Sequence, residues 1–254
     1  MRHLEGIMKS TGTAAALSKR LQTIASFVTV GNTVADIGCD HGFVPIYLVG
    51  QTISPRAIAM DIKTGPLQKA KEHIREYGLE DQIETRLSNG MAQLNPGEVD
   101  SVILSGIGGP LMIQILENGQ EVTASLKELI LSPQSEIETV RRYLLAHSFL
   151  IPEEKMVLED GKYYVIMHVI PKRDGIVSQN KEDWTELEYR YGKSLLEKRE
   201  ETFLSYLEWE INTKRQLLDL LQKTDTERAI QRRKTMHYEL TMAECARNQV
   251  KKSQ

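Results

Sequence analysis

The chain has 254 residues, 41% of them hydrophobic, which is enough for one α/β domain with a real core, alone or with an appendage. Its formal net charge of −3 excludes a polycation, although the part from Lys214 onward carries ten Lys or Arg and only five Asp or Glu. Cys39 and Cys245 have neither disulfide nor zinc spacing, and there is no secretion signal and no apolar run long enough to span a membrane. We therefore expect a cytoplasmic protein without a bound metal.

Strand and helix candidates alternate along the first two thirds of the chain. An amphipathic segment at residues 16–28 has helical spacing and comes first. The alternation that follows predicts a parallel sheet with helices on both of its faces. The predicted strands cover residues 33–38, 56–62, 82–88, 99–106 and 128–133, and the predicted helices include residues 45–50, 65–78, 109–119 and 136–148.

The alternation ends at a hairpin. Residues 154–160 and 162–170 have strand character and flank Asp160-Gly161, which is a strong hairpin turn. We therefore expect an antiparallel pair to close the sheet, followed by a linker at Pro171–Gly175.

The remainder of the chain has no strand signal. One long charged helix from about Lys181 to Gln222, and a second from Asp225 to about Val250, are predicted to form an antiparallel helical hairpin. Such an arm could dimerise, act as a rigid spacer or dock a substrate, and its periodicity does not distinguish these roles.

The most informative turn is Asp36 to Gly42, DIGCDHG, which follows the first predicted strand. Nucleotide-binding folds place a glycine-rich turn there, so that backbone amides can approach a pyrophosphate. Here the central position holds Asp40, whose carboxylate would repel phosphates but attract the amino group and sulfonium of S-adenosylmethionine. Asp40 and His41 could instead simply cap the next helix.

Polar or glycine-rich residues also follow the next three predicted strands. Asp61 can accept hydrogen bonds from both ribose hydroxyls of an adenine-containing cofactor. Asn89-Gly90 could place an amide on the adenine, or could be a plain turn. Residues 106–109 contain three glycines, which would let a flat base lie against the backbone or would only make a tight turn.

Together these segments resemble the bacterial tRNA (adenine-N1)-methyltransferases that modify adenine 22 in the D-arm region. The resemblance spans about residues 14–170 and is carried by LSKRLQTIA, DIGxDHxxxP, AIAMDIKTGPLQKA, LSNGM, GxGG and YYVIMHVI. It implies a Rossmann-like class I methyltransferase sheet with a closing antiparallel hairpin at residues 1–172. It also implies a C-terminal helical, coiled-coil-like domain at residues 173–254.

The resemblance further implies a reaction, in which a methyl group passes from S-adenosylmethionine to N1 of adenine 22 in tRNA and leaves S-adenosylhomocysteine. The implied cofactor site comprises Asp36, Gly38, Asp40, His41, Asp61, Ile62, Asn89, Gly90 and Gly106. The target base would lie near Ile107, Gly108 and Gly109, and Asp40 and His41 are the only candidates for a catalytic role.

Charge alone adds candidate phosphate contacts, which are Lys19, Arg20, Arg232, Arg233 and Lys234. Two other functions stay open at this point. One is a methyltransferase that acts on another RNA position or on a small molecule, and the other is a non-catalytic RNA-binding protein with a methyltransferase fold. A dinucleotide-dependent oxidoreductase is disfavoured by Asp40 and by the closing hairpin.

Overall fold

The computed structural model describes residues 17–171, 184–221 and 226–251. The predicted domain boundary at residue 172, and most of the predicted linker, lie outside these ranges. Within them, every helix is too short or too polar to cross a membrane.

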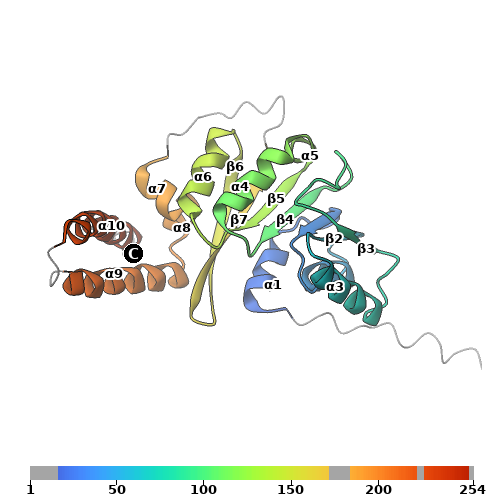
Figure 1. The fold of residues 1–254 in the computed structure, drawn as a ribbon, viewed down its shortest axis with the longest axis horizontal. Helices are drawn as coiled ribbons and strands as arrows, with labels where there is room; N and C mark the ends of the chain where they lie inside the picture. The colour runs from blue at the N-terminus through green and yellow to red at the C-terminus, as the bar shows by residue number, and fades with distance from the viewer. Residues whose placement is uncertain (1–16, 172–183, 222–225, 252–254) are drawn as a thin grey trace, which may run out of the picture.

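A single seven-stranded sheet forms the centre of the molecule, with strand order β3-β2-β1-β4-β5-β7-β6 (Figure 1). The first five strands pair in parallel, and β7 is antiparallel to both β5 and β6. The carboxyl ends of the parallel strands therefore share one edge of the sheet, and β7 begins at that same edge. The strands are β1 (Val34–Ile37), β2 (Ala57–Asp61), β3 (Ile83–Leu87), β4 (Ser101–Ser105), β5 (Glu128–Ser132), β6 (Leu150–Glu159) and β7 (Lys162–Ile170).

Two helical layers cover the sheet because its central strands are apolar on both faces. In β2, Ala57 and Ala59 pack against α2 and α3, while Ile58 and Met60 belong to the core on the opposite face. One layer consists of α1 (Lys19–Ser26), α2 (Phe43–Gly50) and α3 (Thr64–Glu76). The other consists of α4 (Gly109–Asn118), α5 (Gln120–Ser125) and α6 (Ile137–Ala146). The predicted fold class, with its closing hairpin, is confirmed.

A buried carboxylate joins the strands at their amino ends. Glu128 accepts hydrogen bonds from the Thr29 amide at 2.8 Å, Asn32 Nδ2 at 3.1 Å, Ser101 Oγ at 2.7 Å and His168 Nε2 at 2.9 Å. Burial alone would raise the pKa of Glu128, but the donors outweigh it and lower this pKa to about 2. Glu128 thus ties β4, β5 and β7 together at this edge of the sheet.

The C-terminal helices form an arm that packs beside α6 and the β6–β7 hairpin (Figure 1). They are α7 (Glu186–Tyr191), α8 (Lys193–Lys198), α9 (Glu201–Leu221) and α10 (Glu227–Lys251). The last two form the predicted antiparallel hairpin, with ion pairs between Arg215 and Glu244 at 2.6 Å and between Lys251 and Glu208 at 2.8 Å.

The prediction of one long helix from Lys181 to Gln222 was wrong, because three helices occupy its described part. The chain turns at Gly192, which has φ +92°, and at Arg199, which has φ +56°. Gly192 also lies against β6, where a Cβ atom would be 2.1 Å from Oε2 of Glu154. A side chain is therefore excluded at this turn on two grounds, backbone conformation and space.

A buried ion pair fixes the arm to the sheet. Arg141 of α6 and Glu154 of β6 are at most 1% exposed, and Nε and Nη2 of Arg141 both lie 2.8 Å from Oε1 of Glu154. Nη1 of Arg141 donates to the carbonyl oxygens of Tyr189 at 3.1 Å and Arg190 at 2.7 Å. One guanidinium thus holds a sheet carboxylate and the end of α7 together.

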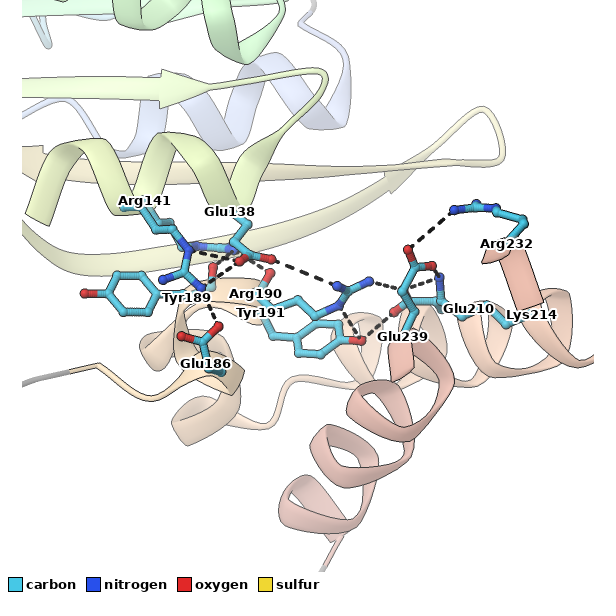
Figure 2. A network of polar contacts seen from close by, with 11 residues as sticks. Glu138, Arg141, Glu186, Tyr189, Arg190, Tyr191, Glu210, Lys214, Arg232 and Glu239 are labelled. Carbon is cyan, nitrogen blue, oxygen red and sulfur yellow. Dashed lines mark hydrogen bonds and ion pairs between the residues drawn. The ribbon is translucent and has the colours of Figure 1, made fainter. Parts of the chain in front are cut away.

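A more exposed chain of polar contacts continues from α6 into the arm (Figure 2). Arg190 lies 4.0 Å from Glu138 and 3.7 Å from Glu210, and the Tyr191 hydroxyl donates to Glu210 at 3.0 Å. Lys214 then joins Glu210 on α9 to Glu239 on α10. The sheet, α7, α9 and α10 are therefore linked as one body.

Replacing Arg141 by Met should lower the free energy of unfolding by about 3–5 kcal/mol, because it leaves a buried carboxylate without its partner. The matched control is Arg142→Met next to it, which removes exposed ion pairs with Glu138 and Glu186 and a contact with the Tyr189 ring and should cost about 1 kcal/mol. Urea unfolding of both variants tests this, and equal costs would contradict it.

Candidate functional site

A cavity of about 520 Å³ lies at the edge where the parallel strands end. This is where ligands bind in open parallel sheets. All nine residues predicted for the cofactor line it, together with Arg20 and Ile107 from the predicted substrate set. The nine are Asp36, Gly38, Asp40, His41, Asp61, Ile62, Asn89, Gly90 and Gly106.

Three backbone amides of the turn after β1 are bonded within the protein. The amides of Gly38 and Cys39 donate to the Met60 carbonyl oxygen at 2.8 Å and 3.0 Å, and the Gly42 amide donates to Cys39 at 2.8 Å. Gly38 has φ +80°, a conformation that favours glycine. A phosphate-binding turn presents free amides to its anion, whereas this turn presents carboxylate side chains.

Asp40 and His41 extend from this turn toward the cavity without capping α2. The N-cap of α2 is Gly42, and no side chain makes a capping hydrogen bond there. The Asp40 side chain is 73% exposed and lies 3.7 Å from Nε2 of His41, which is 35% exposed. Helix capping therefore does not account for these two residues, and both are free to meet a ligand.

Asp36 is the buried acid of the site. It is only 4% exposed, at the end of β1. Burial and, after it, the nearby Asp61 carboxylate raise its pKa to about 7, against the opposing effect of Arg20. Because this group is poised near neutrality, a cation in the cavity would favour its ionised form.

Asp61 and Ile62 form the next wall. The Lys63 amide donates to Oδ1 of Asp61 at 2.8 Å, which holds the carboxylate at the end of β2. Ile62 is 60% exposed, which is unusual for so large an apolar side chain. A carboxylate beside an open apolar surface suits a ribose joined to a flat base.

The two glycine turns after β3 and β4 differ in their relation to the cavity. Gly90, with φ +59°, and Gly106, with φ +77°, line it. Gly108 and Gly109 do not, and they begin α4. A Cβ atom on Gly109 would lie 2.6 Å from the Ser135 carbonyl oxygen, so close packing explains this glycine.

Several lining residues were not predicted from the sequence, among them Phe43, Leu111 and Gln134. Phe43 stacks on His73 with ring centroids 4.9 Å apart and on His41 at 5.6 Å, and Nδ1 of His73 donates to the His41 carbonyl oxygen. Gln134 follows β5 directly, so the rule that ligands meet strand ends would have found it. Phe43 and Leu111 carried no such signal.

Cys39 is not a nucleophile in this cavity. It is 7% exposed, and burial, followed by the Asp36 carboxylate, raises the pKa of its thiol. Within the described part of the chain, no three His, Cys, Asp or Glu side chains are grouped as metal ligands.

The predicted basic contacts lie in different places. Lys19 is exposed at the start of α1, whereas the Arg20 side chain is 21% exposed, lies 3.8 Å from Glu159 and covers the Tyr164 ring at 5.1 Å. Arg232, Arg233 and Lys234 are on α10 and line none of the cavities found among the described residues.

Known proteins resemble the chain both in sequence and in structure. A methyltransferase domain family model matches residues 17–167. The tRNA (adenine(22)-N(1))-methyltransferase of Bacillus subtilis is 36% identical over 151 residues, which are 59% of this chain and 63% of that protein. The aligned part thus spans less than two thirds of that relative.

Solved structures match over both the sheet and the arm. The B. subtilis m1A22 tRNA methyltransferase TrmK has a TM-score of 0.78 at 28% identity, covering 92% of this chain and 99% of that one. Streptococcus pneumoniae Sp1610, a putative tRNA (m1A22) methyltransferase solved in complex with S-adenosyl-L-methionine, has a TM-score of 0.80 at 28% identity, covering 91% and 100%. The predicted resemblance is confirmed, and the chain belongs to the methyltransferase domain family, in the branch similar to these tRNA (adenine(22)-N(1))-methyltransferases.

Proposed function

We propose that this chain is a methyltransferase that uses S-adenosylmethionine to methylate N1 of adenine 22 in tRNA. One observation carries the choice of cofactor: the turn after β1 offers carboxylates to the cavity, while the amides of Gly38, Cys39 and Gly42 are bonded to Met60 and within the turn itself. Such a turn suits a cation better than a pyrophosphate. The names of its relatives supply the substrate.

Different lining residues would contact the ribose, the adenine and the amino acid end of this cofactor. Asp61 would bind the ribose hydroxyls, with Ile62, Asn89 and Gly90 around the adenine. Residues Asp36, Gly38, Asp40, His41 and Gly106 would surround the amino acid end and the sulfonium. When bound, S-adenosylmethionine supplies a methyl group on a positive sulfur, and the neutral thioether of S-adenosylhomocysteine is left.

The target nitrogen needs little chemical help from the protein. N1 of adenine has an in-plane lone pair, so no proton has to leave before attack, and the residues act by positioning the base and excluding water. Methylation makes the base cationic, and Asp40 or His41 could stabilise that charge. Ile107 lines the cavity where the base would enter, with Gly108 and Gly109 behind it.

N1 lies on the pairing edge of adenine, so the base must be unpaired or extruded from a helix to react. We place the contact region at the D-arm, and Lys19, Arg20, Arg232, Arg233 and Lys234 are the proposed phosphate contacts. We also propose a cytoplasmic location, because the proposed substrate is tRNA.

The decisive experiment incubates the purified chain with unmodified tRNA and labelled S-adenosylmethionine, then maps the label. We expect N1-methyladenine at position 22. Label at another nucleotide or on a small molecule would support the alternative methyltransferases. Tight tRNA binding without any transfer would support a non-catalytic RNA-binding protein.

Asp61→Asn should weaken S-adenosylmethionine binding about 10- to 100-fold, because the ribose loses a charged hydrogen-bond acceptor. The amide oxygen can still accept from Lys63, so the turn should persist. Calorimetric titration measures the dissociation constant. Asp81→Asn, an exposed acid just before β3 and outside the cavity lining, is the control and should change nothing.

The affinity for S-adenosylmethionine should fall as pH falls from 8 to 6. The pKa of Asp36 is about 7 in the empty site, so below that pH the carboxyl is protonated and must lose a proton to meet the cation. Titration in two buffers with different ionisation heats should detect the released proton. The Asp36→Asn variant should lose this pH dependence, and a parent profile that is flat would contradict the assignment.

Replacing Arg232, Arg233 and Lys234 together by Ala should weaken tRNA binding. It should also reduce the slope of log binding constant against log salt concentration by about 2. Filter binding at several salt concentrations gives the slope. The control removes three exposed cations of α3, Lys69, Lys71 and Arg75. Equal effects of the two triple variants would argue against a specific role for α10.

A further inference from the structure

A second cavity, of about 500 Å³, lies between the sheet and the arm. We call it the hairpin–arm cavity. Its walls come from the start of β7, from α6 and α7, and from α9. The residues used below are Gln134, Lys162, Tyr163, Tyr164, Tyr206 and Trp209, and all of them line it.

Aromatic rings from two separate elements meet in this cavity. Tyr163 of β7 lies 5.2 Å from Tyr206 and 5.7 Å from Trp209, both of α9, and these two rings are 6.0 Å apart, centroid to centroid. Trp209 is nevertheless 52% exposed. A large ring that is anchored by two others and still open to solvent is typical of a surface that binds a ligand.

The hairpin–arm cavity adjoins the candidate cofactor site. Because β7 runs antiparallel to β5, its first residues stand at the edge where the parallel strands end. Gln134 lines both cavities. Arg20, which lines the cofactor cavity, covers the ring of Tyr164, which lines the other. A strand of nucleic acid with one base at the first cavity would place a neighbour near the second.

The two cavities differ in their charged lining. Three carboxylates, from Asp36, Asp40 and Asp61, line the cofactor cavity, together with the cations of Arg20 and Lys63. No Asp or Glu is among the described residues that line the hairpin–arm cavity, whereas Lys162, Arg141 and Arg190 are. Arg141 is neutralised by Glu154, and Arg190 is near Glu138 and Glu210, so Lys162 is the main candidate for a phosphate contact.

We propose that the hairpin–arm cavity holds an unpaired base of the RNA substrate, next to the base that is methylated, stacked on Trp209 with its phosphate near Lys162. This rests on the proposed function, because it assumes an RNA substrate. Flat rings stacked on aromatic side chains beside a cation are how proteins bind single-stranded nucleic acid without reading its sequence.

The first test measures the affinity of the full chain for unmodified tRNA without cofactor. Trp209→Ala and Trp209→Leu, which keeps apolar bulk but no ring, should each weaken binding about 5- to 100-fold, and Trp209→Phe should keep most of it. The control is Tyr238→Ala, which removes a ring that is 55% exposed on α10. The affinity for S-adenosylmethionine should be unchanged in all four variants, which shows that they are folded.

The second test measures stacking of the neighbouring base directly, first with the unmodified chain. A tRNA with 2-aminopurine beside the target adenine should lose fluorescence on binding, because the probe becomes stacked, and Trp209→Leu should restore it. Full tRNA affinity in both Trp209→Ala and Trp209→Leu would overturn the proposal. It would also be overturned if the probe stayed unquenched both when placed 5′ and when placed 3′ of the target adenine.

These failures are distinct from a failure of the proposed function. If the parent chain methylates adenine 22 and the Trp209 variants bind tRNA normally, only the base-binding role of this cavity is overturned. If the parent chain transfers no methyl group to any RNA, the proposed function itself is overturned, whatever Trp209 does.

Discussion

The arrangement of this molecule depends on the ion pair between Arg141 and Glu154, which is almost completely buried. A buried charge is tolerated only with a partner, so each of these residues fixes the position of the other. Arg141 also binds the last carbonyls of α7, and Glu154 occupies the space that Gly192 leaves open. These contacts hold the arm against the sheet in one position. Together with the buried Phe203 and Leu207, they fix α9, and with it Trp209, relative to the rings of β7.

Because β7 is antiparallel to β5, the strand that contacts the arm begins beside the cofactor cavity. A further parallel strand would begin at the opposite edge of the sheet, where Glu128 joins the strands. The antiparallel β7 instead begins where β1, β4 and β5 end, so its tyrosines stand beside the cofactor cavity. The result is an acidic cavity and an aromatic, basic one on a single edge. A cationic methyl donor and an anionic nucleic acid can then approach each other from regions of matching charge.

Most of the sheet and the cofactor cavity could be predicted, because both depend on local patterns. Apolar runs mark the strands, and the residues that follow a strand meet at one edge, which brings Asp36, Asp61, Asn89 and Gly106 together. The breaks in the arm could not be predicted, since Gly192 owes its conformation to Glu154, 38 positions earlier in the sequence. The hairpin–arm cavity was missed for the same reason. Its rings come from β7 and α9, and only tertiary packing brings them together.

The structure also changes the reason for excluding a dinucleotide. The sequence alone disfavours a dinucleotide through repulsion between Asp40 and phosphates. That side chain is 73% exposed, so water and salt would screen much of its charge. The amides of Gly38 and Cys39 provide the stronger argument, because both are bonded to the Met60 carbonyl oxygen. A pyrophosphate would have to replace those bonds before the turn could hold it. A ligand with an amino group and a sulfonium needs no amide from this turn, and the buried carboxyl of Asp36 lies where it can receive that charge.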